Sequence, residues 1–425
     1  MQEMITIRTN QERSTKKSQK DVYLLVSISV IGYLSILLFY GFLRHIGLKN
    51  AFIEKISPFM AESFLLLIVF AWLLDGANIR KIWISFITYL IMVALVSILT
   101  APTIKSVLLT VRNVLLPIMM LVCLSELHLS SSQIKKLMRR VRVIFVVFTI
   151  IGFIFANIQF TLGWEWTSKF FAGYSFWGTN EDQTVRIVQG WFGFNVLGTM
   201  GNAAIFGFYN GIAILIYLFY AFRRKIFNLL LISLSFYNIL LSGNKTALLA
   251  IAILIFFKFL LSFSWKDKKL LFMIILPFII LLVGIIFLIF RDGKFFYTFQ
   301  MRLELWGELL SNEDYAMNII FPHNLFYFSA GAGNTGLISF WDNAYLYLLY
   351  SIGIVGIIFF LFVIFSTIKK IRAKTNNKFI LYLMMYLAAG ALTTCVFFGK
   401  NIMTLCMIFL GLFAAIVPDE KNILK

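Results

Sequence analysis

Residues 291–343 read RDGKFFYTFQMRLELWGELLSNEDYAMNIIFPHNLFYFSAGAGNTGLISFWDN. This polar, aromatic and glycine-containing segment lies between apolar runs that are long enough to cross a membrane. Most other connections in the chain are only a few residues long, and long loops are where functional groups concentrate. A segment of about fifty residues in this position is therefore the first place to expect a functional site.

The composition of the whole chain predicts an integral membrane protein. Of its 425 residues, 60% are hydrophobic and only 13% charged, and the mean hydropathy is +0.89. Soluble domains carry about 25% charged residues. The apolar segments are mostly about 18–25 residues long, which suits helices that cross a hydrocarbon core of about 30 Å. The predicted fold is all-α and polytopic, with residues 1–425 forming a single membrane domain.

Twelve transmembrane helices are predicted from the apolar segments. An even number of spans places both termini on the same side of the membrane. The first span lacks a small-residue cleavage site, so we expect it to remain uncleaved. The predicted spans lie at about 22–43, 58–75, 82–101, 105–125, 142–161, 193–221, 226–242, 245–264, 269–290, 343–367, 378–398 and 402–417.

The positions of Lys and Arg predict the orientation. The formal net charge is +19, but about 25 of the 38 Lys and Arg residues fall in alternate connections, against about 11 on the other face. Basic residues favour cytoplasmic loops, so both termini are predicted to be cytoplasmic. Residues 1–21 then form a polar basic cytoplasmic tail. Two long loops face outward, at about 162–192 and 291–342.

A surface helix is predicted inside the second outer loop. Residues 297–311 (YTFQMRLELWGELLS) have helical periodicity, and Arg302 and Trp306 are i, i+4 neighbours. A guanidinium beside a large ring suits a phosphate or diphosphate that carries an apolar tail. An Arg that reaches lipid phosphates, or that pairs with Glu304 or Glu308, would produce the same pattern.

Three further basic residues are candidates for binding an anion. Lys245 begins a helix after a Gly-Asn turn, where free N–H groups already favour an anion, although a lysine anchoring a helix end would look similar. Arg112 lies about 10 Å deep in the fourth span, where it needs a cavity or a charged partner. Arg186 ends the first outer loop and could also pair with Glu181 or Asp182.

Proton transfer and anion binding are also possible in residues 322–346, PHNLFYFSAGAGNTGLISFWDNAYL. Three glycines, with Gly333 in the middle, permit a tight backbone path whose N–H groups can hold an anion. His323 and Asp342 combine a titratable group with a predicted outer position. An Asp before a helix is also a common N-cap, so a capping role for Asp342 stays open.

The glycines in GTMGNAAIFGF (residues 198–208) predict either close helix packing or a broken helix near the outer face. Metal binding is not predicted. No His, Cys or carboxylate cluster has the spacing of metal ligands, and no outer loop contains an Asp-Asp or Asp-x-Asp pair. The three cysteines, Cys123, Cys395 and Cys406, lie in apolar segments and are interpreted as small buried hydrophobic residues.

Several of these motifs, in this order, resemble those of Wzy-type polysaccharide polymerases, which are relatives of the O-antigen ligases. SGNKTALLA is similar to the Ser-Arg-x-Ala-Leu-Leu segment of that family, with Lys245 at the basic position. MRLELW resembles the helix of the large outer loop that carries an Arg and a Trp. GAGNTG followed by WDNAYLYLLYSIGIVGIIFF resembles the glycine loop and the next span. Asp342 stands where many members have His, and HNLFYFSAGAGNTG is one residue shorter than the corresponding ligase motif.

The resemblance implies a glycosyltransferase in the bacterial cytoplasmic membrane. It would polymerise undecaprenyl-diphosphate-linked repeat units into capsule, exopolysaccharide or O-antigen at the outer face, with inversion and without a metal or cofactor. The expected partners are the lipid-linked donor and acceptor, membrane lipid, a chain-length regulator and a flippase, and not nucleic acid. The implied residues are Asp342 and His323 in catalysis, Arg302, Lys245, Arg112 and Arg186 at the diphosphate, and Trp306, Asn343 and Gly333 along the substrate.

Other functions fit part of the pattern. A flippase or transporter for lipid-linked oligosaccharides would also have about twelve spans, but such proteins usually place the site near the midplane between repeated halves. No internal repeat is evident here. A ligase would transfer the glycan to a different acceptor, and a non-catalytic scaffold would need none of the basic residues.

Overall fold

The computed structural model describes residues 2–47, 51–76, 79–100, 104–171, 189–190, 193–260, 303–304, 306–307, 311, 320, 343–375, 378–391 and 402–417. Its elements are α1 (Gln2–Leu38), α2 (Tyr40–Gly47), α3 (Ala51–Leu74), α4 (Lys81–Thr100), α5 (Ile104–Ser125), β1 (Leu129–Ser130), α6 (Ser131–Phe170), β2 (Gln189–Gly190), β3 (Gly193–Phe194), η1 (Gly198–Met200), α8 (Ala203–Phe219), α9 (Lys225–Ser242), α10 (Lys245–Leu260), α14 (Ala344–Lys374), α15 (Lys378–Ala391), α16 (Ile402–Ala414) and β4 (Ile416–Val417).

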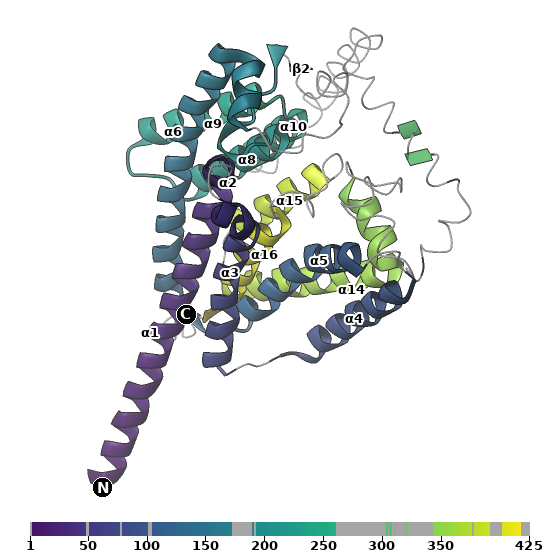
Figure 1. Ribbon diagram of the computed structural model, residues 1–425. Coiled ribbons are helices and arrows are strands. Elements are labelled where there is room, and N and C mark those ends of the chain that lie inside the picture. Colours follow the sequence, from purple (N-terminus) through teal and green to yellow (C-terminus); the bar gives the residue numbers. More distant parts are fainter. Residues whose placement is uncertain are drawn as a thin grey trace.

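The described part of the protein is almost entirely helical, as predicted (Figure 1). Helices occupy eleven of the twelve predicted segments, and the remaining one, 269–290, lies outside the described residues. Two small pairs of strands add to the helices: β1 pairs with β4 in parallel, and β2 with β3 in antiparallel. Four described helices are long and apolar enough to cross a membrane: Gln19–Leu38, Ser131–Phe170, Lys225–Ser242 and Ala344–Lys374. Seven shorter apolar helices accompany them, so the number of spans stays a prediction.

The N-terminal helices form one side of the bundle. In Figure 1, α1, α3 and α6 run nearly parallel, whereas α4, α5 and α14 cross them steeply. Gly32 of α1 permits close contact with α3, because a Cβ at this position would collide with Phe64, and Ser29 Oγ donates to the Phe64 carbonyl at 2.6 Å. The predicted polar tail, residues 1–21, is helical from Gln2 onward and continues directly into the first apolar segment.

The helix α6 is longer than predicted. A span was expected at about 142–161, but the helix begins at Ser131, where Ser130 and Gln133 form a capping box. At its other end Gly163 (φ 78°, ψ −175°) interrupts the helical geometry, and a short helical piece continues to Phe170. The first part of the predicted outer loop, 162–192, is therefore helical. Its aromatic residues pack with Phe42 and Phe155 in a small separate core.

Apolar side chains are both buried between the helices and exposed on their outer faces. Large residues such as Trp83, Tyr209 and Tyr350 are fully buried in the main core. Phe365 on α14, by contrast, is 65% exposed, and similar residues lie on α3, α4, α6 and α9. Extended apolar surface on many helices is costly in water and favourable in lipid, so it supports a membrane location.

A buried polar network joins α6, α8 and α9. Asn238 Nδ2 donates to Asn210 Oδ1 at 3.0 Å and to the Thr149 carbonyl at 3.3 Å. The Thr149 hydroxyl in turn lies 2.8 Å from the Tyr217 hydroxyl and 3.2 Å from the Ser235 hydroxyl. Buried polar groups that satisfy one another fix the register of neighbouring helices.

Basic residues collect where α5, α14 and α16 end, a region we call the basic end. Arg80 Nε donates to Glu126 Oε1 at 2.6 Å, and Lys370 Nζ lies 3.9 Å from Glu126 Oε2. Lys370 also donates to the Ser125 carbonyl at 2.6 Å, and Lys374 to the Ala414 carbonyl at 3.1 Å. Cations at helix C-termini satisfy free carbonyls and oppose the negative end of the helix dipole.

Candidate functional site

The structure describes only part of the predicted site. Lys245, Asn343 and Trp306 lie within the described residues, and Arg112 is part of α5, although its side chain is outside the description. The other predicted residues lie outside the described part of the chain: Asp342, His323, Arg302, Arg186 and Gly333.

Lys245 is the first residue of α10 and is half-buried. The preceding Asn244 is 8% exposed and caps the helix, because its Oδ1 accepts a hydrogen bond from the Ala247 N–H at 2.9 Å. Before it, Gly243 (φ 63°) makes the tight turn that ends α9, and a Cβ there would collide with Asn195. The tight turn and helix start predicted at this motif are confirmed.

The start of α8 lies beside the start of α10. Asn202 caps α8 by accepting from the Ile205 N–H at 3.0 Å. Asn244 Nδ2 donates to the Ala204 carbonyl at 2.5 Å and so ties the two helix starts together. A Cβ at Gly207 would collide with the side chains of Asn244 and Ser242. The close packing predicted for the 198–208 glycines is confirmed at Gly207, and the chain also leaves α-helical geometry at η1, before α8 begins. The position of this break relative to the membrane stays a prediction.

The start of α14 is capped by Asn343, which is 7% exposed. Its Oδ1 accepts from the N–H groups of Tyr345 at 2.9 Å and Leu346 at 3.0 Å. The capping role considered for Asp342 is therefore wrong, because the neighbouring residue performs it. Asn and Asp are equally good caps, so the sequence alone could not distinguish them.

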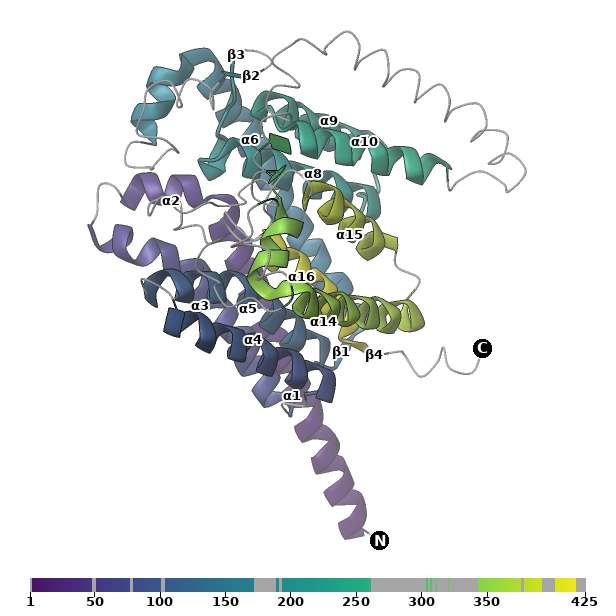
Figure 2. The ribbon, with the colours of Figure 1, turned by 90° about the vertical axis from the view of Figure 1, so that its right-hand side faces the viewer.

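The starts of α14 and α8 lie at the same end of the bundle because both contact the end of α15. The Tyr345 hydroxyl donates to the Ala388 carbonyl at 2.8 Å, near the end of α15. The Tyr386 hydroxyl donates to the Phe208 carbonyl of α8 at 3.0 Å. Figure 2 shows the starts of α10 and α14 and the end of α15 on one side of the bundle. We call this region, defined by Asn202, Asn244 and Asn343, the N-cap end.

The N-cap end favours negatively charged groups. Three helices, α8, α10 and α14, begin there, so the positive ends of their dipoles meet at this end, while the Asn side chains accept from first-turn N–H groups of each helix. Lys245 adds a basic side chain at one of these starts. Asp342 immediately precedes Asn343 in the chain, so the long segment 291–342 must end here. Lys245 and the end of that segment therefore lie at the same end of the bundle.

A bend in α14 was not anticipated from the sequence. Gly353 (φ 66°, ψ 177°) interrupts the helix, and the Tyr89 hydroxyl of α4 donates to the Ile352 carbonyl at 2.6 Å. A side chain thus takes the place of a lost helical N–H donor. Gly356, the second glycine of the Gly-x-x-Gly pair, lies against Tyr89 and Ile352, where a Cβ would collide. The role of Tyr89 had no local signal in the sequence.

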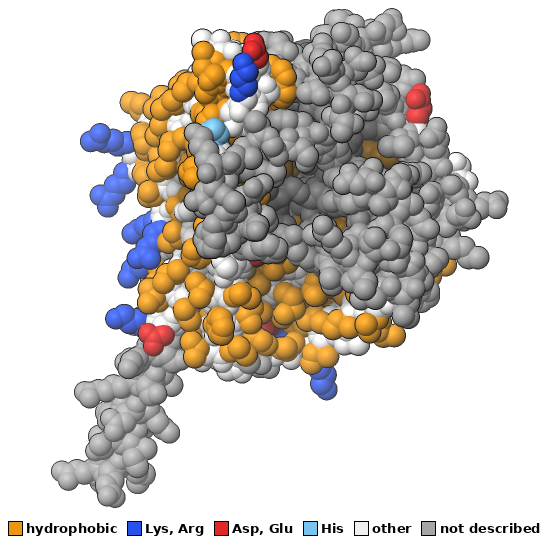
Figure 3. Space-filling view, in the orientation of Figure 1, with side chains coloured by type: hydrophobic (Ala, Val, Ile, Leu, Met, Phe, Trp, Pro, Cys, Tyr) orange, Lys and Arg blue, Asp and Glu red, His pale blue; other side chains and the backbone are white. Residues whose placement is uncertain are grey.

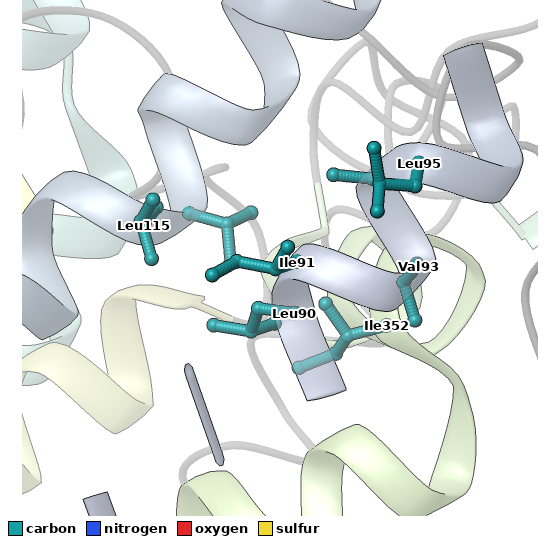
Figure 4. A pocket seen from close by; sticks show the side chains of 8 residues that line it. Leu90, Ile91, Val93, Leu95, Leu115 and Ile352 are labelled. Carbon is teal, nitrogen blue, oxygen red and sulfur yellow. The ribbon is translucent and has the colours of Figure 1, made fainter. Parts of the chain in front are cut away.

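Beside this bend is an apolar cavity of about 100 Å³ between α4, α5 and α14 (Figure 4). Leu90 and Ile91 of α4, Leu115 of α5 and Ile352 of α14 point into it. Val114, which also lines it, comes two residues after Arg112 on α5. Aliphatic walls of this kind accept hydrocarbon and offer nothing to a polar ligand.

Trp306 belongs to the predicted surface helix. Leu303, Glu304, Trp306, Gly307 and Ser311 all have helical backbone conformation, which is consistent with a helix over this part of the loop. Trp306 is half-buried against the main core, whereas Leu303 is 49% exposed. The ring therefore contacts the bundle.

The chain matches no protein-family model and no curated protein.

Proposed function

We propose that the protein is a membrane glycosyltransferase that polymerises undecaprenyl-diphosphate-linked repeat units at the outer face of the bacterial cytoplasmic membrane. In this proposal the protein has twelve spans, both termini are cytoplasmic, and the N-cap end faces outward. The observation that carries the proposal is the position of Lys245, at a capped helix start that lies at the same end of the bundle as the start of α14.

The diphosphate of the donor would bind at the N-cap end. Lys245 and the positive dipole end of α10 suit a phosphate oxygen. Arg302, Arg112 and Arg186 would add charge from the outer loops and from α5. The apolar cavity between α4, α5 and α14 would take part of the polyprenyl chain, because its walls are aliphatic. A charged headgroup and a hydrocarbon tail thus each find a matching environment.

The proposed reaction transfers the growing glycan to a hydroxyl group of the acceptor. The hydroxyl oxygen attacks the anomeric carbon, the bond from that carbon to the diphosphate oxygen breaks, and the configuration inverts. Basic side chains stabilise the negative charge that develops on the leaving diphosphate. Asp342 or His323 accepts the proton from the hydroxyl. Trp306, Asn343 and Gly333 line the path of the substrate.

The proposal is tested with membranes that contain the protein and purified lipid-linked repeat units. Wild-type membranes should produce a ladder of longer glycans, and Arg302→Ala should lose it. Lys245→Arg should retain more activity than Lys245→Gln, because the role of this residue is positive charge. Full ladder formation by Arg302→Ala at normal expression would exclude the proposed diphosphate site, and equal loss in both Lys245 variants would indicate a steric role.

A transporter is distinguished by where its substrate accumulates. In a deletion strain, loss of a polymerase leaves single lipid-linked repeats on the outer leaflet, whereas loss of a flippase leaves them on the inner leaflet. A ligase would instead leave polymerised but unattached glycan. These three outcomes distinguish a polymerase, a flippase and a ligase without knowledge of the sugars in the repeat unit.

A further inference from the structure

A second cavity lies at the other end of α8, away from the N-cap end. It has a volume of about 1210 Å³ and is formed by α6, the connection between α8 and α9, and the first turn of α9. Five of its lining side chains are basic, and none is acidic. The basic residues are Arg139, Arg142, Arg223, Arg224 and Lys225.

The shape of this cavity is fixed by two side chains. Arg142 Nη1 donates to the carbonyls of Tyr220 at 2.7 Å and Ala221 at 2.9 Å, at the end of α8, and its guanidinium lies 3.7 Å from the centre of the Phe222 ring. Asn228 holds the other side of the connection, since its side chain bonds to both the N–H and the carbonyl of Phe222 at 2.7 Å. The basic connection is therefore held in place without a ligand.

The charge of the cavity is not balanced by the described carboxylates. Arg139, Arg223, Arg224 and Lys225 are exposed, and none of them forms an ion pair with a described Asp or Glu. The helix α9 begins at this cavity, so its first N–H groups lie there, and the side chain of Arg224 does not cap them. Concentrated positive charge next to a helix start creates a strong local potential for an anion.

The cavity also has an apolar rim. Ile226 is 84% exposed and Leu230 is 53% exposed, and both line it. α6 and α9 are two of the four helices that are long and apolar enough to span a membrane, so the cavity lies where their apolar faces meet charged residues. Figure 3 shows Lys and Arg side chains along the edge formed by α6, next to apolar surface. A ligand that combines phosphate with acyl chains satisfies both parts.

We propose that this cavity binds the phosphate headgroup of an anionic phospholipid, with its acyl chains against the apolar rim. The site is separate from the N-cap end and does not depend on polymerase activity. A soluble anion would make no use of the exposed Ile226 and Leu230. Each basic side chain near an anionic headgroup contributes about a fivefold factor in affinity.

The test uses the full-length protein in detergent, titrated with short-chain phosphatidylglycerol or phosphatidylcholine, with bound lipid counted by native mass spectrometry. The wild type should bind phosphatidylglycerol at least about tenfold more tightly than phosphatidylcholine. The variant Arg223→Gln/Arg224→Gln/Lys225→Gln should lose at least about tenfold in that affinity. A single Arg139→Gln variant should lose about fivefold, and serves if the triple variant is unstable.

The matched control removes equal charge elsewhere. Lys135, Lys136 and Arg140 are exposed on the same helix, α6, but do not line the cavity. Their triple Gln variant should change phosphatidylglycerol binding less than twofold. Equal losses in the two triple variants, or no lipid preference in the wild type, would overturn the proposal. So would displacement of the lipid by inorganic phosphate or by poly-glutamate at comparable concentration, because either would indicate a small-anion or acidic-protein site.

Discussion

Asn244 connects the stability of the bundle to the proposed anion site, and its replacement tests both. In Asn244→Ala, α10 loses the cap to Ala247 N–H, and the bond from Nδ2 to the Ala204 carbonyl is lost as well. Loss of an N-cap costs about 1 kcal/mol, and loss of a further buried hydrogen bond about 1 kcal/mol. The expected destabilisation is therefore about 2 kcal/mol.

Asn202→Ala is the matched control, because Asn202 caps α8 through one bond to the Ile205 N–H and makes no comparable tie to another helix among the described residues. Its expected cost is about 1 kcal/mol. Thermal unfolding in detergent should show a fall in midpoint for Asn244→Ala that is about twice that for Asn202→Ala. Equal shifts would show that the bond between the starts of α8 and α10 contributes nothing to stability.

Asn244→Asp keeps the cap to the Ala247 N–H and adds negative charge at the start of α10. A carboxylate oxygen then replaces the donor beside the Ala204 carbonyl, so the cost should be at least that of Asn244→Ala, about 2 kcal/mol, and activity is compared per folded protein. The new carboxylate lies beside Lys245 and opposes binding of a diphosphate. Ladder formation should fall at least about tenfold, in line with about 1.4 kcal/mol or more of lost binding. Full activity would refute the reasoning that places an anion at the start of α10.

Two further substitutions test the packing. Glu126→Gln removes the carboxylate between Arg80 and Lys370, whose side chains are 35% and 25% exposed. Because the pairs are only partly buried, the variant should be destabilised by about 2 kcal/mol, less than the roughly 3–5 kcal/mol for breaking a fully buried pair. An unchanged unfolding midpoint would contradict this. Gly243→Ala combines a positive φ with a collision and should cost more than Gly76→Ala, where φ is also positive but the space is open; equal thermal shifts would show that the collision is relieved without cost.

The sequence predicted helix positions well where apolar runs end at turn residues. The predicted segment 226–242 corresponds to Lys225–Ser242, and 105–125 corresponds to Ile104–Ser125. The start of α6 was not predicted, because hydropathy indicates which residues are buried in lipid rather than where a helix begins. The basic residues before 142 are good helix formers behind a capping box, so the helix starts eleven residues earlier than the predicted span.

At the candidate site, local chemistry was predictable and long-range contacts were not. The Gly243-Asn244 turn before Lys245 follows from residue types alone. The bond between Tyr89 and the Ile352 carbonyl joins residues 263 positions apart, and the bond between Lys370 and the Ser125 carbonyl joins residues 245 positions apart. No periodicity or spacing encodes such pairs, because they depend on how the helices pack.

The proposed reaction joins lipid-linked repeat units without a metal ion. The most direct measurement reconstitutes the purified protein in vesicles with defined undecaprenyl-diphosphate-linked repeats and EDTA. The predicted result is a ladder of glycans, with one undecaprenyl diphosphate released for each new glycosidic bond. Repeats that cross the bilayer without becoming longer, or that are lengthened only when a divalent cation is restored, would contradict it.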